Sequence, residues 1–527
     1  MLFAGGGYAK IHPAVDRALR GQTETTTVWI MFADKGNVDT NAALAVLETT
    51  YNKRAIERRR ARRTAPGLFD KRDLPVHDPY VQLVQETGAN LRVTSRWCNA
   101  VSVEATAAQI HEIATYPFVE QIQPVRSLRP LPVTSPNTAA DTPSNKDPLQ
   151  AGGFYGLSED QLQQINLIDL HDAGYTGKGV VIGVLDTGFR KSHIAFNSVI
   201  NPLQIVAEYD FVNDDSETGP EPGDPFNQHN HGSFILGTLA AFSPQTMVGG
   251  AYTASYILAK VEEIGSEFKA EEDWFVAGLE FIEANGGDVA TSSLTIQGFY
   301  SQDELDGMTS VMTIGLNVAT ANGVHCCQAA GNSGHDANPS TAHLVPAADA
   351  FLTLTCGAVD LDGNIAGFSS DGPTADGRVK PELLARGVNT FTIDPSGDDS
   401  YTSVSGTSLS TPLEAAAVAC LVQAHPDWTV GQMRSALFET ADFYVANGTF
   451  DPLFVRGFGL LNAHVAWQAE PRATGDLDGD GTVGASDLLI LLVNWGPCAD
   501  CNDCIADLNG DCSVGAADLL ILLVNWG

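Results

Sequence analysis

The run V-V-I-G-V-L at residues 180–185 has no polar side chain at any position. A strand that is apolar throughout is typical of a parallel sheet covered by helices on both sides, because neither face of such a strand meets water. Strand and helix patterns alternate from about residue 154 to 467 and include an Ala-rich helical run at 415–419. The sequence therefore predicts an α/β domain with a parallel sheet and helices on both faces.

A chain of 527 residues exceeds what one hydrophobic core usually holds, so we expect several domains. Apolar strand patterns at 27–32 and 100–104, each followed by a helix-like stretch, predict a small α+β domain ahead of the parallel sheet. A segment rich in Pro, Ser and Thr then predicts an exposed linker. The expected units are the α+β domain at 1–130, a linker at 131–153, the α/β domain at 154–467, a joint at 468–475 and a C-terminal module at 476–527.

Charge is unevenly distributed along the chain. The formal net charge is −35, which argues against nucleic-acid binding because phosphate contacts need clustered Lys and Arg. Residues 1–150 nevertheless hold 18 of the 29 Lys and Arg residues against 15 acids, so they would attract the acidic remainder if the two parts pack together. Within them, K-R-A-I-E-R-R-R-A-R-R at 53–63 predicts a basic helix whose charged face we expect to be solvated.

Three short motifs occur in a fixed order: V-L-D-T-G at 184–188, H-N-H-G-S at 229–233 and S-G-T-S-L-S-T-P at 405–412. Each motif alone could be a turn, a structural histidine or a helix N-cap. The chain order Asp, His, Ser is the subtilisin order of the serine triad and differs from the chymotrypsin and α/β-hydrolase orders. With these motifs, residues 154–467 resemble the subtilisin-like (subtilase) serine peptidases.

The resemblance implies an endopeptidase that hydrolyses protein or peptide substrates through an acyl-enzyme and needs no cofactor for the chemistry. Ser408 would be the nucleophile, His231 its general base and later the acid, and Asp186 the group that orients the imidazole. His229 is a competing base, but the small-residue helix after His231 matches the family pattern. In the same way, A-A-G-N-S-G at 329–334 matches the family's oxyanion segment and assigns a donor role to Asn332.

The segment D-V-A-T-S-S-L at 288–294 resembles the family's strand along the substrate cleft, where an extended peptide could add as a further strand. The residues expected to flank the pocket for the residue before the cut are Ser292, Ser293, Leu294, Ala329, Ala330 and Gly331. Their small size predicts a roomy pocket, with no acidic residue at its base. One departure from the family is L-E-A-A after Pro412, which places Glu414 near the nucleophile helix.

The N-terminal region, with V-W-I-M-F-A-D-K-G at 28–36 and R-W-C-N-A-V-S-V at 96–103, looks like the inhibitory pro-domain of secreted subtilases. This implies a self-processing precursor that matures within roughly 130–155 and is secreted or placed at the cell surface. The sequence contains no run of about 18 apolar residues, so it predicts no membrane span. Met1–Gly7 is too short for a signal peptide and lacks a basic start. Either the gene start is misplaced or truncated, which we favour, or the protein is not exported by the usual route.

The C-terminal module contains a repeat: G-A-S-D-L-L-I-L-L-V-N-W-G at 484–496 recurs, with one change, at 515–527. Each copy follows oxygen-bearing side chains at the spacing of a calcium loop. The expected Ca²⁺ ligands are Asp476, Asp478, Asp480, Thr482 and Asp487 in the first loop and Asp507, Asn509, Asp511, Ser513 and Asp518 in the second. Cys512 replaces the turn glycine of the second loop. Paired loops of this kind resemble a type I dockerin module, which implies a cohesin-like partner.

Four of the nine cysteines gather in this module, at Cys498, Cys501, Cys504 and Cys512. Either two disulfides or a zinc site would use all four. Their spacing fits the paired C-x2-C ligands of zinc poorly, and an extracellular protein favours disulfides.

Two other functions compete with this interpretation. A sedolisin-type acid peptidase has the same fold but carries a Glu where this chain has His231. A catalytically silent surface protein, anchored through its dockerin-like module, would not need the intact set of Asp186, His231, Asn332 and Ser408. The residues therefore favour the serine peptidase.

Overall fold

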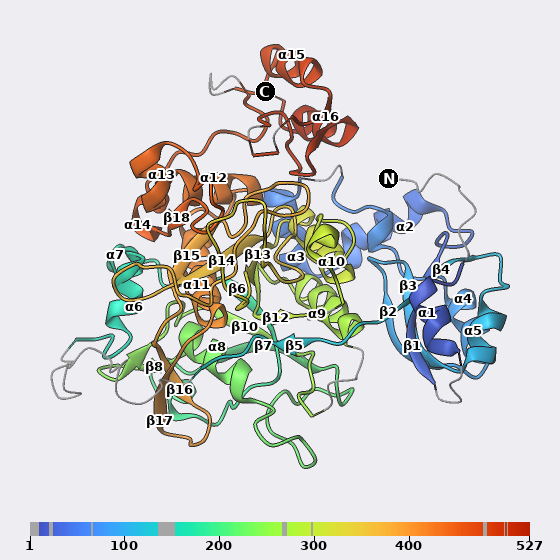
Figure 1. Ribbon diagram of the computed structural model, residues 1–527, viewed down its shortest axis with the longest axis horizontal. Helices are drawn as coiled ribbons and strands as arrows, with labels where there is room; N and C mark the ends of the chain where they lie inside the picture. Colours follow the sequence, from blue (N-terminus) through green and yellow to red (C-terminus); the bar gives the residue numbers. More distant parts are fainter. Residues whose placement is uncertain are drawn as a thin grey trace.

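The computed structural model describes residues 10–20, 25–64, 67–134, 153–265, 271–296, 299–477, 482–499, 501–502 and 504–526. They form an N-terminal sheet domain, a central α/β domain and a C-terminal pair of helices (Figure 1). The predicted ligands Asp478 and Asp480 lie outside the described residues, as does most of the predicted linker. No described helix is both long enough and apolar enough to cross a bilayer.

The central domain is built on an eight-stranded sheet with the order β18-β15-β14-β13-β11-β6-β10-β7. Every neighbouring pair in it is parallel, as the apolar run at 180–185 predicts. The strands are β6 (Val181–Asp186), β7 (Gln204–Asp210), β10 (Ser255–Lys260), β11 (Val289–Ser292), β13 (His325–Ala329), β14 (Leu354–Val359), β15 (Leu383–Arg386) and β18 (Gly459–Leu460).

Helices cover both faces of this sheet, which confirms the predicted fold class. Alternate residues of β6 show the two layers: Ile182 and Val184 pack in one hydrophobic cluster with α8 and α11, while Val181 and Leu185 pack in another with α9 and α10. The helices of the domain are α6 (Glu159–Gln164), α7 (Leu167–Asp172), α8 (Asn230–Ala240), α9 (Glu272–Ala284), α10 (Val311–Ala321), α11 (Thr407–Ala424), α12 (Val430–Thr440), α13 (Asp442–Asn447) and α14 (Ala463–Trp467).

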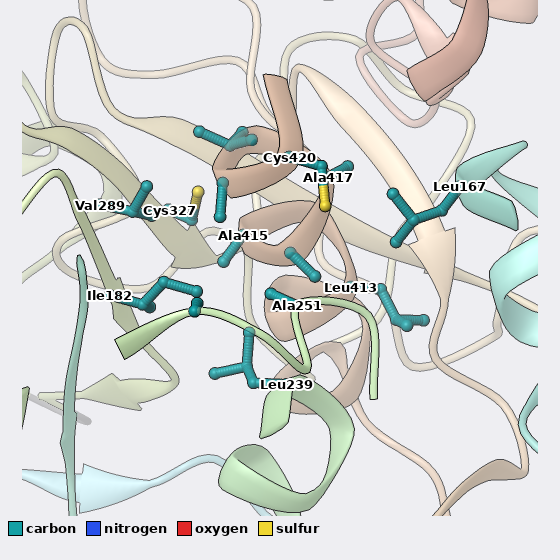
Figure 2. Packing of buried hydrophobic residues seen from close by; sticks show 14 of the residues in the cluster. Leu167, Ile182, Leu239, Ala251, Val289, Cys327, Leu413, Ala415, Ala417 and Cys420 are labelled. Carbon is teal, nitrogen blue, oxygen red and sulfur yellow. The ribbon is translucent and has the colours of Figure 1, made fainter. Parts of the chain in front are cut away.

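Helix α11 runs through the core and is buried from Thr407 to Val422. Figure 2 shows its small side chains Ala415 and Ala417 among residues from the sheet, α7 and α8. Small residues let the helix approach the sheet closely. This packing fixes the N-terminus of α11, and with it Ser408, relative to the strands.

The N-terminal domain is an antiparallel sheet of order β2-β3-β1-β4 with helices beside it. The predicted strands at 27–32 and 100–104 correspond to β1 and β3, so the expected α+β domain is confirmed. Its elements are α1 (Pro13–Leu19), β1 (Thr26–Phe32), α2 (Thr40–Thr50), α3 (Lys53–Arg62), α4 (Asp78–Glu86), β2 (Asn90–Ser95), β3 (Ala100–Ala105), α5 (Ala107–Ile113) and β4 (Val119–Pro124).

The prediction that the charged face of the basic helix α3 is solvated is wrong. Figure 1 shows α3 away from the sheet of its own domain and against the central domain, and Arg58, Arg59 and Arg62 are buried there. Buried carboxylates of the central domain pair with them: Glu283 contacts Arg58 and Arg59, and Asp288 lies 3.3 Å from Arg62. Burial alone would raise the pKa of Glu283, but the guanidinium groups lower it to about 2.

The C-terminal module holds two helices, α15 (Ala485–Val493) and α16 (Ala516–Val524), one from each repeat. Its cysteines form the disulfides Cys498–Cys504 and Cys501–Cys512, which confirms the preference for disulfides over zinc. The remaining strands form short pairs: β5 (Arg129–Pro130) with β12 (Leu294–Thr295), β8 (Phe242–Ser243) with β9 (Met247–Val248), β16 (Thr390–Asp394) with β17 (Ser400–Val404), and β19 (Gly496–Pro497) with β20 (Ser513–Val514).

Candidate active site

A buried carboxylate and an imidazole meet at the carboxyl end of β6. Asp186 is the last residue of that strand, and its Oδ1 lies 2.8 Å from Nδ1 of His231, near the start of α8. The same oxygen accepts hydrogen bonds from the backbone N–H and the hydroxyl of Thr187. These bonds hold the carboxylate in place, so it can fix the orientation of the imidazole and leave Nε2 for chemistry.

The competing base lies elsewhere. His229 is the N-cap residue of α8, and its Nε2 is 3.2 Å from Oδ2 of Asp224 rather than near Asp186. Burial lowers its pKa. The hydrogen bond to Asp186 therefore belongs to His231, the residue that the sequence analysis selected.

Ser408 lies in the first turn of α11 and is fully buried. Pro412 has no N–H with which to bond the carbonyl of Ser408 four residues earlier, and the hydroxyl of Ser293 donates to that carbonyl instead, at 3.2 Å. Among the described residues, neither Oγ of Ser408 nor Nε2 of His231 has a hydrogen-bond partner. Nucleophilic catalysis needs such a pair, a buried hydroxyl and a buried ring nitrogen that are not already engaged in hydrogen bonds with other described residues.

Asn332 follows β13 and is anchored to the same helix start. Its Oδ1 accepts from the N–H of Thr407 at 2.9 Å and from the hydroxyl of Thr407 at 2.8 Å, which fixes the direction of the amide. The opposite end, Nδ2, donates to the carbonyl of Pro132 at 2.8 Å. The side-chain amide of Asn332 is therefore held in one orientation, and in it the amide donates to a peptide carbonyl of the N-terminal part of the chain.

The six predicted pocket residues, Ser292, Ser293, Leu294, Ala329, Ala330 and Gly331, are all buried at the carboxyl ends of β11 and β13. The pairing of β12 with β5 adds an extended segment to this edge, in the way that strand addition predicts. Leu131, directly after β5, is 1% exposed and packs against Ala329.

Sequence reasoning missed one pocket residue, Val345. It is buried in the same cluster as Leu131 and Ala329, so the pocket is bounded by a branched side chain that the prediction of a roomy pocket did not include. It also lies against Gly331, where an added Cβ would come within 2.8 Å of it. Val345 belongs to no motif, and nothing in the local sequence marks it as a pocket residue.

Glu414, the departure from the family pattern, is fully buried on α11. Burial raises its pKa well above the ordinary value. It interacts with Cys327 of β13.

In the predicted calcium loops, the last carboxylate of each loop accepts backbone hydrogen bonds. Asp487 accepts from the N–H groups of Leu477 and Gly484, and Asp518 does the same for its own loop. Burial, together with the charge of Asp518, raises the pKa of Asp507 to about 7. Cys512 adopts the left-handed φ of 61° that glycine usually supplies at this turn. Mutually repelling carboxylates with an all-oxygen donor set are what a Ca²⁺ ion would stabilise.

A second acidic cluster, which sequence reasoning did not identify, lies in the central domain. Ligand atoms of Asp210, Asp215 and Glu221 all lie within 4.8 Å of one another. Oδ2 of Asp210 is, however, 2.7 Å from the ammonium of Lys260. Lys260 therefore already compensates part of this negative charge.

Comparison with known proteins decides the family. A profile of the subtilase family matches residues 177–460, more than half of the chain and a span that includes Asp186, His231, Asn332 and Ser408. The chain belongs to the subtilase family. Residues 27–142 of this subtilase match a second profile, the peptidase S8 propeptide domain of Bacteroidota, so its N-terminal sheet is a propeptide domain.

Curated relatives agree with this assignment. The subtilase is 31% identical to subtilisin of Bacillus pumilus over 60% of its own length and 98% of that protein. It is 32% identical to subtilisin E of Bacillus subtilis (strain 168), over 60% of its own length and 71% of that protein. The chain is therefore a subtilisin-like serine endopeptidase.

A solved structure shares the architecture. Fervidolysin from Fervidobacterium pennivorans, described as a keratinolytic enzyme related to subtilisin, aligns with a TM-score of 0.61 at 19% sequence identity. The alignment covers 87% of this chain and 65% of fervidolysin, and at this identity it supports the fold alone.

Proposed function

We propose that this subtilase hydrolyses peptide bonds in proteins with Ser408 as nucleophile, His231 as general base and acid, and Asp186 as the orienting carboxylate. The observation that carries the proposal is the 2.8 Å contact between Nδ1 of His231 and Oδ1 of Asp186, on a histidine whose other ring nitrogen has no partner among the described residues. The tautomer with a proton on Nδ1 leaves Nε2 as a base. Asn332 supplies the oxyanion donor.

Each group has one task in the reaction. Nε2 of His231 takes the proton of Ser408 Oγ as that oxygen attacks the substrate carbonyl. The developing oxyanion accepts from Nδ2 of Asn332 and from the backbone N–H of Ser408, which lies in the first turn of α11, where N–H groups have no intrahelical acceptor. His231 then protonates the leaving amine, and water repeats the sequence on the acyl-enzyme.

The flanking regions make the chain a regulated precursor in this proposal. The propeptide domain inhibits the enzyme until self-processing, and the mature protein is secreted or held at the cell surface. The proposed units are 1–130, 131–153, 154–467, 468–475 and 476–527. The oxygen-rich loops of the last unit bind Ca²⁺, and as a dockerin-like module it binds a cohesin-like protein.

Covalent labelling tests the catalytic assignment directly. Processed wild-type protein should react with a fluorophosphonate probe, and peptide mapping should place the label on Ser408. Ser408→Ala should abolish both labelling and self-processing, while Ser410→Ala, a buried hydroxyl in the same turn of α11, should retain labelling. Correctly processed protein that hydrolyses peptides without labelling at Ser408 would refute the proposed triad.

For Asn332, the expected loss is in turnover. Asn332→Ala should lower kcat on the order of 100- to 1,000-fold with a small change in KM, because the amide acts on charge that develops in the transition state. An unchanged kcat would remove Asn332 from the mechanism.

A further inference from the structure

The turn that carries Asn332 lies against a short segment of the central domain, residues 368–371. The N–H of Gly334, two positions after Asn332, donates to the carbonyl of Phe368 at 2.8 Å. Ser370, within the same segment, is 1% exposed. The backbone around the proposed oxyanion donor is therefore anchored on a buried part of the fold.

Ser370 contacts the residues on both sides of Asn332. Its backbone N–H donates to the carbonyl of Gly331 at 3.0 Å, and its hydroxyl oxygen accepts from the N–H of Ser333 at 3.0 Å. The approach to Gly331 is close, because a Cβ added there would lie 2.6 Å from Oγ of Ser370. One buried serine thus holds the backbone directly before and directly after Asn332.

Ser370 and Thr407 hold different parts of this turn. Thr407 binds the side chain of Asn332, whose Oδ1 accepts from the N–H and the hydroxyl of Thr407. Ser370 instead holds the backbone from which that side chain projects. A catalytic donor has to be kept within about 0.5 Å of its productive position, so both the amide and its backbone need to be fixed.

We propose that Ser370 is a positioning residue for the peptidase reaction: through Gly331 and Ser333, it holds the backbone of Asn332 so that the amide reaches the developing oxyanion. Ser370 itself has no contact with the substrate in this proposal. Its substitution should therefore act only through the hydrogen bond that Asn332 donates. The inference rests on the proposed function and deepens it.

The neighbouring Ser369 provides a matched control. Both serines are 1% exposed, and each hydroxyl oxygen accepts one backbone N–H at 3.0 Å, from Ser333 to Ser370 and from Ala358 to Ser369. Substitution by alanine removes the same group at both positions and leaves one backbone N–H without its acceptor. The two variants should therefore lose comparable stability and differ only in catalysis.

The test measures kcat and KM for a peptide substrate, with the processed protein obtained from the full-length chain. Ser370→Ala should lower kcat about 5- to 20-fold and leave KM within about twofold, because Asn332 acts on charge that develops in the transition state. Ser369→Ala should keep kcat within about twofold of the wild type. Ser370→Cys is nearly isosteric but has a weaker acceptor, so it should lower kcat about 2- to 5-fold.

A double substitution separates positioning from a general loss of structure. In an Asn332→Ala background, Ser370→Ala should cause no further loss of kcat, because the group that it positions is absent. Thermal denaturation of every variant checks that the protein is folded. If Ser370→Ala does not fold, the comparison with Ser369→Ala is made with Ser370→Cys.

Three results would overturn the inference: equal losses of kcat in Ser370→Ala and Ser369→Ala, an undiminished effect of Ser370→Ala in the Asn332→Ala background, or a wild-type kcat in Ser370→Cys. Fluorophosphonate labelling separates these results from failure of the proposed function. Active wild-type protein labelled at Ser408 keeps the peptidase whatever the Ser370 variants do. Wild-type protein that neither labels nor hydrolyses peptides refutes the peptidase, and the inference with it.

Discussion

The propeptide domain contacts the enzyme at the two ends of one strand, β11, and the two contacts depend on different forces. Beyond the carboxyl end, at Ser293, the contact consists of backbone hydrogen bonds and the buried side chain of Leu131. Just before the amino end, at Asp288, it consists of guanidinium groups of α3 against buried carboxylates and backbone carbonyls. The first contact depends on the register of the strand in the cleft, whereas the second depends on ion pairs and on guanidinium hydrogen bonds to the backbone.

This difference separates inhibition from attachment. The arginine contact involves none of the proposed catalytic groups. Further charged pairs extend it along α9, where Arg92 lies 3.0 Å from Asp273 and Arg96 lies 3.1 Å from Glu283. We therefore expect the processed propeptide to stay bound until it is degraded. The predictions below use the Ser408→Ala precursor, in which both contacts remain uncut.

The largest effect should come from Arg59. It lies 2.9 Å from Glu283 of the central domain and 2.7 Å from Asp73 of its own domain, so Arg59→Ala removes one guanidinium partner from two buried carboxylates. The free energy of unfolding should fall by about 3–5 kcal/mol in chemical denaturation. Arg60→Ala, on the exposed side of the same helix, should change it by less than about 0.5 kcal/mol. Equal effects of the two substitutions would contradict a charge-dependent contact.

A smaller loss is expected in the cleft. Leu131→Ala removes a buried side chain from the pocket formed with Ala329 and Val345 and should cost about 2–4 kcal/mol. Thr134→Ala keeps the backbone pairing with Ser405 and removes only an exposed hydroxyl and methyl group, so it serves as the control. If Leu131→Ala matched this control in denaturation, the pocket would not contribute to holding the propeptide.

A pH dependence distinguishes the two contacts further. Glu272 donates its N–H to the carbonyl of Arg126 in the propeptide region, and burial raises the pKa of its side chain to about 7. The folded state therefore binds more protons than the unfolded state above about pH 4.5, so this stability is lost as the pH rises through 7. The part due to Glu272 should reach roughly 3 kcal/mol by pH 8 and be absent in Glu272→Gln, while the neighbouring Glu271, whose pKa burial raises to about 8, keeps its own contribution. A stability curve with the same slope in both proteins would show that Glu272 is not the titrating group.

The smallest effect on either contact should come from calcium removal. EDTA should lower the melting temperature of the C-terminal module, whose loops lose the ion that offsets the repulsion around Asp507. It should leave propeptide attachment unchanged, because neither contact includes module residues. An Asp518→Asn variant should melt like the EDTA-treated protein. A calcium-dependent change in propeptide attachment would show that the C-terminal module and the two contacts are not independent.

The fold of the central domain could be predicted because its strands carry the pattern of a doubly covered sheet. The proposed catalytic groups could be named because they lie in short, contiguous motifs. The choice of His231 over His229 followed from the family pattern after His231, and the structure adds the observation that the ring of His231 meets Asp186 while that of His229 lies by Asp224. Val345 could not be predicted either, because it reaches the pocket through chain folding and belongs to no motif.

The basic helix shows why a local pattern can mislead. The sequence around residues 53–63 indicates no acidic partner, so it predicts that their charged side chains face water. Their partners Glu283 and Asp288 lie more than 200 positions later and belong to no charge pattern of their own. The excess of positive charge in residues 1–150 was the better signal. It predicted attraction between the two parts without identifying the residues.

The distribution of sulfur in the chain has a consequence for its biogenesis. Cys326, Cys327, Cys356 and Cys420 are buried in the catalytic core, where burial raises the pKa of each thiol, and Figure 2 shows Cys327 and Cys420 enclosed by apolar side chains. Thiols of this kind react slowly with oxidants and with other disulfides. Once the core has closed, an oxidising compartment can cross-link the C-terminal module without scrambling the enzyme, and a reductant should unfold the module while the peptidase continues to work.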